Sequence, residues 1–368
     1  MMSSSLYLGL MSGTSLDGVD AVLADFASAR PTVLACVSLP YPDSLRSAVL
    51  ALQPRGDNEL DRAARLGREL AQLYAQAVHA TLAAAGVSAN QVAALGCHGQ
   101  TVRHAPHAGY TIQLGDLALL AELTGVDTIG DFRRRDLAAG GQGAPLVPAA
   151  HQAWFAHPTE ARAVLNLGGI GNLTRLDPAL PVMGFDTGPG NMLLDAWIGQ
   201  HQPGQRFDAN GEWAASGQCL PALLAELLTE PYFAGPPPKS TGRDLFSLDW
   251  LQPHLAAHPG LAAADVQRTL LALTVYSVAD AVRQHAPATR AVYVCGGGAL
   301  NPLLMAELAA ALPDCAVAST DALGIPAMQV EALAFAWLAR QYCLRQPGNV
   351  PAVTGAQGER VLGALYPR

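Results

Sequence analysis

The chain is almost without lysine: its 22 basic side chains are Lys239 and arginines. This scarcity excludes two classes of phosphate-transferring protein. A P-loop NTPase needs a lysine at the end of its glycine-rich phosphate loop, and a protein kinase needs one on an inner strand. Lys239 follows three consecutive prolines, residues 236–238, so it fits neither pattern.

Charge, long apolar runs and paired cysteines are also scarce. Only 14% of the residues are charged and the net charge is −8, so neither a nucleic-acid-binding nor a membrane-binding face is expected. No uncharged apolar run reaches the roughly 18 residues that a membrane span needs. No cationic segment precedes the short apolar stretch at residue 6, so we expect no signal peptide. The six cysteines form no CxxC pair, which favours reduced thiols and a cytoplasmic protein.

The chain is long and apolar enough for two domains. Half of its 368 residues are hydrophobic, and domains usually span about 100–200 residues. Residues 6–10 and 19–26 are predicted to be strands joined by a polar turn. Residues 163–167 and 173–176 repeat this hairpin around a glycine-rich tip. The hairpins lie about 155 residues apart, which indicates two related lobes.

Strands and helices alternate in the remaining sequence, which predicts an α/β class with mostly parallel sheets. Further strands are expected at residues 92–97, 128–130, 182–185 and 291–295. Helices are expected at residues 57–85, 190–198, 266–284 and 327–341, and another is expected to begin near Asn301.

The turn at residues 11–20 is the first candidate site. It offers two glycines, two hydroxyls and two carboxylates: Gly13, Gly18, Thr14, Ser15, Asp17 and Asp20. Backbone amides beside glycine can hold a phosphate, and the carboxylates could hold Mg²⁺ through water. A plain polar hairpin is the alternative, but the turn is longer than a tight hairpin needs.

Asp186 is the second candidate. It follows the strand expected at residues 182–185, so it would lie at the edge of the sheet where open α/β folds place ligands. A carboxylate there could act as a general base, and the glycines that follow leave the approach to it open. Alternatively, Asp186 or Asn191 caps the next helix.

Two further polar segments follow the strands expected at residues 92–97 and 128–130. In the first, His98 and Gln100 are expected to contact a ligand, although a surface loop is the alternative. The histidine spacing fits no zinc pattern. In the second, one arginine of the run at residues 133–135 could bind a carboxylate or phosphate in a bidentate manner, although a charge run is usually a solvated surface.

The last candidates are a glycine run and a glutamate near the end of the chain. Three glycines, residues 296–298, follow a predicted strand and would let a flat ring such as adenine lie against the backbone, unless they form only a tight turn. Glu331 lies in an otherwise apolar helix, where a charged side chain needs a partner or a site unless it lies on the surface.

Together these motifs resemble those of the anhydro-N-acetylmuramic acid kinase family, within the actin, sugar-kinase and Hsp70 superfamily. The matching segments cover nearly the whole chain: residues 11–20, 98–101, 131–136, 140–145, 166–172, 185–191 and 238–243. The resemblance implies a two-lobed α/β, actin-like ATPase fold, related to ribonuclease H, with an active-site cleft between the lobes. Residues 1–132 with 340–368 would form the first lobe, and residues 133–339 the second.

The resemblance also implies a reaction. Kinases of this family add water across the anhydro bridge of 1,6-anhydro-N-acetylmuramic acid and phosphorylate O6 with ATP. The products are N-acetylmuramic acid 6-phosphate and ADP, and the reaction serves cell-wall recycling. Asp186 would then be the base that activates water for attack at C1, and Glu331 would help to hold that water. ATP and Mg²⁺ are the cofactors implied, and a homodimer is expected.

The remaining roles are carried over by position. The nucleotide would contact Gly13, Thr14, Ser15, Leu16, Asp17, Gly18, Val19, Asp20, Gly168, Gly169, Gly296 and Gly297. The sugar would contact His98, Gln100, Arg133, Gln142 and Asn191, with the choice among arginines 133–135 left open. The loop at residues 236–243 would present Lys239 or Arg243 to an anionic ligand. The alternatives are another sugar or carboxylate kinase of the superfamily, or an actin-like nucleotide-binding scaffold.

Overall fold

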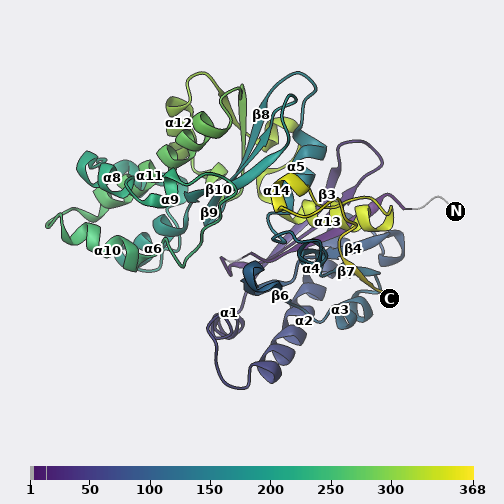
Figure 1. Cartoon of the computed structure of the whole chain (residues 1–368). Helices are drawn as coiled ribbons and strands as arrows, with labels where there is room; N and C mark the ends of the chain where they lie inside the picture. The colour runs from purple at the N-terminus through teal and green to yellow at the C-terminus, as the bar shows by residue number, and fades with distance from the viewer. Residues whose placement is uncertain (1–3, 14) are drawn as a thin grey trace. The chain divides into compact units, whose positions relative to one another are not determined.

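The computed structural model describes residues 4–13 and 15–368. The chain forms two compact units, one comprising Met1–Trp154 with Gln329–Arg368 and the other Phe155–Met328. The first unit contains both ends of the chain, coloured purple to blue and yellow in Figure 1. These limits differ from those expected from the sequence, because residues 133–154 and 329–339 belong to the first unit.

Both units are built on a sheet of the same design. In the first, the strand order is β13-β7-β4-β1-β2-β3, and in the second it is β10-β9-β8-β11-β12. The first sheet comprises β1 (Leu6–Met11), β2 (Gly18–Asp25), β3 (Thr32–Pro40), β4 (Ala94–Cys97), β7 (Thr128–Gly130) and β13 (Ala364–Tyr366). The second comprises β8 (Arg162–Leu167), β9 (Ile170–Leu176), β10 (Met183–Pro189), β11 (Ala291–Cys295) and β12 (Ala316–Ser319).

The direction of the strands repeats as well. In each unit the first three strands along the chain form an antiparallel meander, and the next two extend the sheet in parallel from the first. The two hairpins found in the sequence therefore open two copies of one fold, which confirms the related lobes. The expectation of mostly parallel sheets was wrong, because the meanders, and β13 beside β7, are antiparallel.

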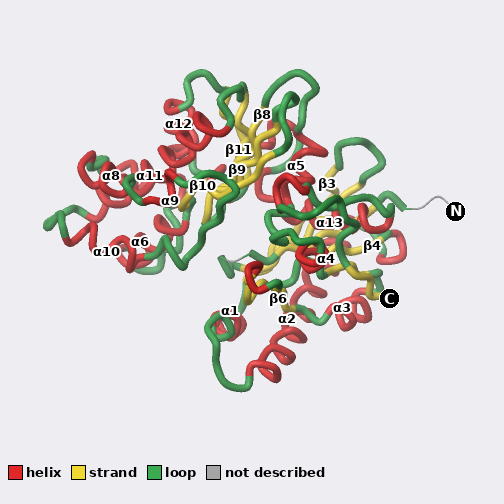
Figure 2. The backbone as a smooth tube through the Cα atoms, viewed as in Figure 1, coloured by secondary structure: helices red, strands yellow, loops and turns green. Residues whose placement is uncertain are grey.

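Helices cover these sheets, as the red and yellow segments of Figure 2 show for each unit. The first unit has α1 (Asp43–Leu50), α2 (Glu59–Ala85), α3 (Leu117–Thr124), α4 (Phe132–Ala138), α13 (Val330–Cys343) and α14 (Pro351–Thr354). A strand ribbon, β5 (Gln100–Ala105) with β6 (Tyr110–Leu114), also belongs to it, and α5 (Val147–Phe155) ends where the second unit begins. The second has α6 (Met192–His201), α7 (Glu212–Ser216), α8 (Pro221–Leu227), α9 (Pro231–Ala234), α10 (Leu248–Ala256), α11 (Ala263–His285) and α12 (Pro302–Ala311).

The helix ends follow from local sequence. Asn301 caps α12 by accepting a hydrogen bond from the Leu304 amide at 3.0 Å, and Pro302 occupies the first helical position, where its missing N–H is harmless. Gly86 ends α2 and Gly125 ends α3, each at φ 65°, a left-handed conformation that glycine adopts at little cost.

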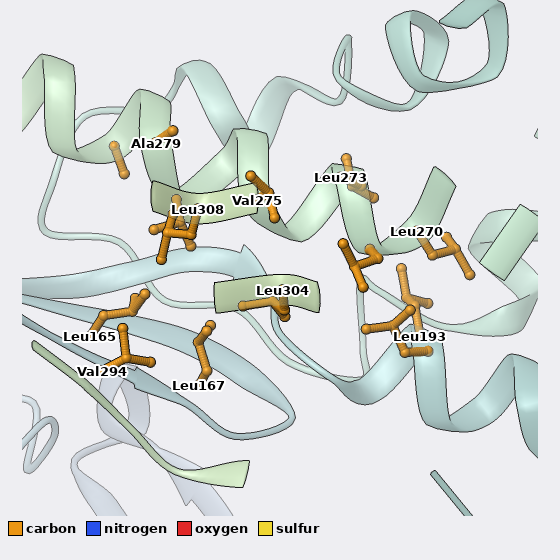
Figure 3. Packing of buried hydrophobic residues seen from close by; sticks show 14 of the residues in the cluster. Leu165, Leu167, Leu193, Leu270, Leu273, Val275, Ala279, Val294, Leu304 and Leu308 are labelled. Carbon is orange, nitrogen blue, oxygen red and sulfur yellow. The ribbon is translucent and has the colours of Figure 1, made fainter. Parts of the chain in front are cut away.

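Each unit has its own apolar core. In the second, Leu165, Leu167 and Val294 of the sheet face apolar side chains of α11 and α12, among them Leu304 and Leu308 (Figure 3). Burying a leucine or valine side chain contributes about 1.5–3 kcal/mol, so this contact holds both helices on the sheet.

In the first unit, α13 packs on β1 and β4 through two glycines that are neighbours across the parallel pair. A Cβ atom on Gly9 would lie 2.0 Å from the Ala332 carbonyl oxygen, and one on Gly96 would lie 2.0 Å from the Phe335 carbonyl oxygen. The helix backbone therefore rests directly on the sheet, which fixes the position of Glu331 in the first turn of α13.

The structure gives the state of the cysteines and the length of the apolar helices. All six cysteines are free thiols. None of the helices in the described part of the chain is both long and apolar enough to cross a membrane.

Candidate active site

The first hairpin tip joins β1 to β2, and two of its apolar side chains are buried in the core of the first unit. Leu16 and Val19 are each 1% exposed and belong to the core of the first unit. Leu16 adopts φ 61°, a left-handed conformation that non-glycine residues rarely take, and its burial holds it there. Of these two residues only the backbone could contact a nucleotide. Thr14, also expected in the site, lies outside the described residues.

The two glycines of this tip differ in what surrounds them. A Cβ on Gly18 would lie 2.1 Å from the Leu39 carbonyl oxygen, so this glycine is needed for packing against β3. A Cβ on Gly13 would meet nothing closer than the Ser15 hydroxyl at 3.7 Å. Ser15 and Asp17 are exposed. Among the described residues of the tip, Gly13, Ser15 and Asp17 are therefore the accessible ones, and a phosphate could approach backbone amides there.

Asp17 and Asp20 suit a magnesium ion held with water. Burial raises the pKa of Asp20, the Ser38 hydroxyl lowers it by donating a hydrogen bond, and the charge of Asp17 raises it. The two carboxylates thus lie within electrostatic reach of each other. No group of three or more His, Cys, Asp or Glu side chains able to hold a metal occurs in residues 4–13 and 15–368. Carboxylate oxygens are ligands that Mg²⁺ prefers, and this ion usually keeps several of its waters.

His98 and Gln100 support the hairpin tip. The His98 Nδ1 donates to the Ser12 carbonyl oxygen at 3.2 Å, and the Gln100 amide donates to the Gly13 carbonyl oxygen at 3.2 Å. The Ser12 hydroxyl in turn donates to the Gly99 carbonyl oxygen at 3.0 Å. His98 is 6% exposed and Gln100 fully buried, so neither is a surface loop residue.

Arg133 is oriented by His98, and its two neighbours are not. Its guanidinium donates to His98 Nε2 from Nη2 at 2.8 Å and to the Gly143 carbonyl oxygen at 2.8 Å. Burial lowers the pKa of Arg133 to about 10, while the charges of Glu331 and Asp136 act in the opposite sense. Burial, with the charge of Arg133, lowers the pKa of His98 to about 3, so the imidazole is neutral. Arg134 and Arg135 are exposed, which favours Arg133 as the ligand-binding arginine.

Asp136 fixes the loop that follows. Its carboxylate is fully buried and accepts hydrogen bonds from the Gly143 amide at 2.8 Å, the Asn349 side chain at 2.7 Å and the Thr354 hydroxyl at 2.8 Å. The backbone amide of Gln142 donates to the Thr354 carbonyl oxygen at 2.8 Å, which leaves the Gln142 side chain exposed.

Replacing Asp136 by asparagine is expected to destabilise the first unit by about 1–3 kcal/mol, the cost of a buried polar group without a partner. In either orientation, the NH₂ group of the new side chain faces a group that now donates to Asp136. That group is the Gly143 amide on one side, and the Asn349 amide with the Thr354 hydroxyl on the other. Urea unfolding followed by fluorescence measures the change. Asp131→Asn is the matched control, because among the described residues the Asp131 carboxylate pairs with the exposed Arg134, at 3.1 Å, and a shift below about 1 kcal/mol is expected. Equal shifts in both variants would contradict the role of Asp136.

The second hairpin tip joins β8 to β9 and has two open glycines. A Cβ on Gly168 or Gly169 would meet no atom closer than 3.7 Å, whereas one on Gly190 would lie 2.4 Å from the Gly168 carbonyl oxygen. Gly190 is thus required by packing, while Gly168 and Gly169 leave room for a ligand. Asn191 does not cap α6 with its side chain, which donates instead to the Leu167 carbonyl oxygen at 3.2 Å.

The glycine run after β11 divides in the same way. Gly296 adopts φ 79°, and a Cβ there would lie 2.5 Å from the Asn166 side-chain oxygen, so packing requires this glycine. A Cβ on Gly297 would make only an ordinary contact, 3.5 Å from the Asn191 side chain. Gly297 therefore lies beside Asn191 and leaves space at the surface of the second unit.

Asp186 lies inside β10 and not beyond its end, which corrects the expectation from sequence. The strand continues to Pro189 and its register with β9 shifts between Asp186 and Gly188. Such a bulge re-aims a side chain within a strand. The carboxylate accepts hydrogen bonds from the Asn172 side chain and, at 2.9 Å, from the Thr241 amide.

The environment of Asp186 suits a general base. Burial raises its pKa to about 6, and the hydrogen bonds from Thr241 and Asn172 limit that rise by stabilising the charged form. A carboxylate with a pKa just below neutrality is both ionised at pH 7 and basic enough to accept a proton.

Glu331, in the first turn of α13, lies close enough to Arg133 to influence its pKa. It therefore belongs to the cluster of the first unit that includes His98. Asp186 belongs to the second unit.

Sequence reasoning missed the residues that hold the candidates in place. Asn172 stands directly opposite Asp186 in the β9–β10 register, and the spacing of the hairpin could have revealed it. Tyr41 donates to the Gln100 side-chain oxygen at 2.9 Å, and Tyr232 donates to the Asp186 carbonyl oxygen at 2.7 Å. No local pattern marks either tyrosine.

Two solved structures are similar to this chain at low sequence identity. The activator of 2-hydroxyisocaproyl-CoA dehydratase from Clostridium difficile, with bound ADPNP, is 12% identical, with 92% of this chain and 96% of that chain covered and a TM-score of 0.49. A ROK family glucokinase from Streptomyces griseus, in complex with glucose and AMPPNP, is 14% identical, with 91% and 99% covered and a TM-score of 0.41.

Sequence comparison is far more specific. The family model described as anhydro-N-acetylmuramic acid kinase matches residues 5–368. The protein of that name from Chromobacterium violaceum is 58% identical over 99% of this chain and 100% of its own length. Its counterpart from Bordetella petrii is 59% identical over 98% of this chain and 96% of its own. Because the match spans both units and every candidate motif, the chain belongs to the anhydro-N-acetylmuramic acid kinase family.

Proposed function

We propose that this protein is an ATP-dependent kinase that opens the 1,6-anhydro ring of 1,6-anhydro-N-acetylmuramic acid by adding water and phosphorylates O6. The products are N-acetylmuramic acid 6-phosphate and ADP, formed in peptidoglycan recycling. The observation that carries the proposal is the full-length match to relatives of that name, at 55–59% identity. A basic, partly buried carboxylate at Asp186 supports it.

In the proposed mechanism Asp186 takes a proton from a water molecule as that water attacks C1. The bond between C1 and the bridging oxygen breaks, and the electron pair stays on that oxygen, which becomes O6. O6 then attacks the γ-phosphorus of ATP, and ADP leaves. Glu331 helps to hold the water, and Arg133 binds an anionic or polar group of the sugar, such as its lactyl carboxylate. His98 and Gln100 act through the segments that they hold.

The nucleotide would be bound mainly by backbone. The accessible residues Gly13, Ser15 and Asp17 of the first tip support this, as do Gly168, Gly169 and Gly297, where a Cβ would meet no atom closer than 3.5 Å. Backbone amides and hydroxyls replace the phosphate-binding lysine that this chain lacks. Asp17 and Asp20 would hold Mg²⁺ through water, and the bound ion would neutralise charge on the triphosphate.

Incorporation of oxygen from solvent tests the reaction. The protein is incubated in ¹⁸O water with ATP, magnesium and the anhydro sugar, and the product is identified by mass. We expect a gain of water plus phosphate, with ¹⁸O at C1. Phosphorylation of a free hydroxyl without solvent oxygen would indicate another sugar kinase. ADP release that does not depend on any sugar would indicate a nucleotide-binding scaffold.

The pH dependence follows from the proposed base. Asp186 must be ionised to accept a proton, and burial raises its pKa to about 6. We therefore expect kcat/KM to be constant above pH 7 and to fall about tenfold for each unit of pH below 6. Steady-state rates from pH 4.5 to 8.5, with unfolding checked at each pH, measure this. A profile flat down to pH 5 would contradict the assignment.

We expect a cytoplasmic enzyme, because its reduced cysteines and its use of ATP both suit that compartment. We also expect a homodimer. Light scattering coupled to size exclusion measures the mass of the assembly, and a monomer at micromolar concentration would contradict the dimer.

A further inference from the structure

Asp186 is held from a segment far along the chain. The Asp186 amide donates to the Lys239 carbonyl oxygen at 3.0 Å, and the Asp186 carbonyl oxygen accepts from the Tyr232 hydroxyl at 2.7 Å. The Thr241 amide donates to the carboxylate at 2.9 Å. Among the described side-chain contacts of Asp186, that with Asn172 comes from β9 instead. Residues 232–241 therefore hold the backbone of Asp186 on both sides and one of its carboxylate oxygens.

Lys239, the only lysine of the chain, connects the two ends of residues 232–241. The Lys239 ammonium donates to the carbonyl oxygens of Tyr232 and Phe233, each at 3.0 Å, and lies 4.7 Å from the centre of the Tyr232 ring. These carbonyls belong to the C-terminal end of the four-residue helix α9; that of Tyr232 also accepts from the Gly235 amide at 3.2 Å, and a carbonyl oxygen at a helix end can accept a further donor. A cation at a helix C-terminus is favourable for that reason.

The beginning of this segment, to which Lys239 donates, packs on buried side chains of the second unit. The Phe233 ring stacks on Phe246 at 5.5 Å between centroids, and Phe246 is 1% exposed. A Cβ on Gly188 would lie 2.6 Å from the Phe233 ring, so this ring also packs on the bulge of β10. Lys239 thus connects the residues that hold Asp186 to a fixed point in the core of the second unit.

We infer that Lys239 is a positioning residue for Asp186, whose ammonium keeps residues 232–241 closed so that the Thr241 amide and the Lys239 carbonyl set the direction of the carboxylate. This inference rests on the proposed role of Asp186 as the base. Two of the three ammonium donors are used in this contact. The contact of Lys239 with an anionic ligand, expected from the sequence, becomes an outcome of the test.

Kinetics of Lys239→Met separate these roles, because methionine keeps an unbranched side chain and removes every donor. We expect kcat to fall at least about tenfold, as a base displaced by a fraction of an ångström loses its alignment, with KM for ATP and for the sugar within about twofold of wild type. Lys239→Arg should restore most of kcat, since a guanidinium can also donate to two carbonyls. A raised KM with kcat unchanged would overturn the inference in favour of ligand contact. An unchanged kcat and KM would overturn it in favour of a solvated loop.

Tyr232→Phe provides a second variant in case Lys239→Met does not fold. It removes the donor to the Asp186 carbonyl oxygen and keeps the ring on which the ammonium rests. We expect a lower kcat with both KM values kept, and a double variant with Lys239→Met that is no worse than the more damaged single one. Independent, multiplying effects would contradict a shared action through one segment.

Arg175→Met is the matched control. Arg175 is also a cation of the second unit that donates to two carbonyl oxygens, those of His285 at 3.0 Å and Pro181 at 2.9 Å, but it has no contact with residues 232–241 among those described. We expect this variant to lower stability and to leave kcat unchanged. A fall in kcat equal to that of Lys239→Met would mean that any weakening of this unit slows the reaction, and would overturn the inference.

Amide hydrogen exchange gives a readout that does not depend on the reaction. In Lys239→Met without ligands, peptides containing Asp186 and Thr241 should exchange at least about tenfold faster than in wild type, while peptides of α11 should not change. Unchanged exchange would overturn the positioning role even if kcat falls. If the wild type showed no sugar-dependent ADP release, the proposed function would fail, and the exchange data alone would decide whether Lys239 holds Asp186.

Discussion

Asp186→Asn is expected to lower kcat by roughly 10²–10⁴-fold, the contribution of a well-placed general base. Asparagine has the size and shape of aspartate but cannot accept the proton of the attacking water. Its side-chain oxygen can still accept from the Thr241 amide, and Asn172 can turn its own amide to accept from the new NH₂. Sugar binding should therefore persist. Single-turnover formation of phosphosugar measures the rate, and calorimetry with the anhydro sugar measures the affinity.

The control is Asp177→Asn, in the exposed turn after β9. The Asp177 carboxylate accepts only from the Ala179 amide, at 2.8 Å, among its described contacts, so a wild-type rate is expected. If Asp186→Asn kept a rate within about threefold of wild type, Asp186 would not be the base. If rate and sugar affinity fell together, its role would be in binding.

The repeated fold was predictable because each of its two hairpins has a local pattern of alternating apolar residues. Alternating apolar residues predicted β1 and β2, and the same pattern around residues 163–176 predicted β8 and β9. Strand direction was not predictable in this way, because β3 and β10 return antiparallel beside their own hairpins. A period of two describes a strand but says nothing about its neighbour.

The roles expected for single residues of the candidate site stay predictions, and the structure adds contacts that the sequence did not indicate. His98 and Gln100 have the residue types of ligand-binding groups, yet their hydrogen bonds hold Ser12 and Gly13. Asp186 was expected after a strand, and it lies in one, because a bulge lets a strand continue past it. Its partner Thr241 is 55 residues away, a distance at which no local pattern connects two residues.

The sequence also does not show which glycines leave space for a ligand and which are required by packing. Gly13 and Gly168 leave room for a ligand, whereas Gly18 and Gly190 are required because another backbone comes within 2.4 Å of where a Cβ would lie. In the sequence all four are equivalent members of glycine-rich motifs. Only the packing separates glycines that make space from those that allow two parts of the backbone to meet.

Gly9→Ala is accordingly expected to destabilise the first unit by about 3 kcal/mol, the upper part of the range for overpacking. The new Cβ would lie 2.0 Å from the Ala332 carbonyl oxygen and 2.6 Å from the Ala336 amide nitrogen. Both are backbone atoms of α13, so no side chain can turn aside and the helix must move off β1. Glu331 precedes Ala332 and would be displaced with it.

Differential scanning calorimetry measures the effect, because each unit contributes to the transition. At roughly 2–4 °C per kcal/mol for a unit of this size, the first-unit transition of Gly9→Ala should fall by about 6–12 °C. Gly96→Ala should behave alike, since its Cβ would lie 2.0 Å from the Phe335 carbonyl oxygen. Gly168→Ala is the matched control: its Cβ has open space, so its transitions should not move. A Gly9→Ala protein as stable as this control would mean that α13 does not rest on the sheet through these glycines.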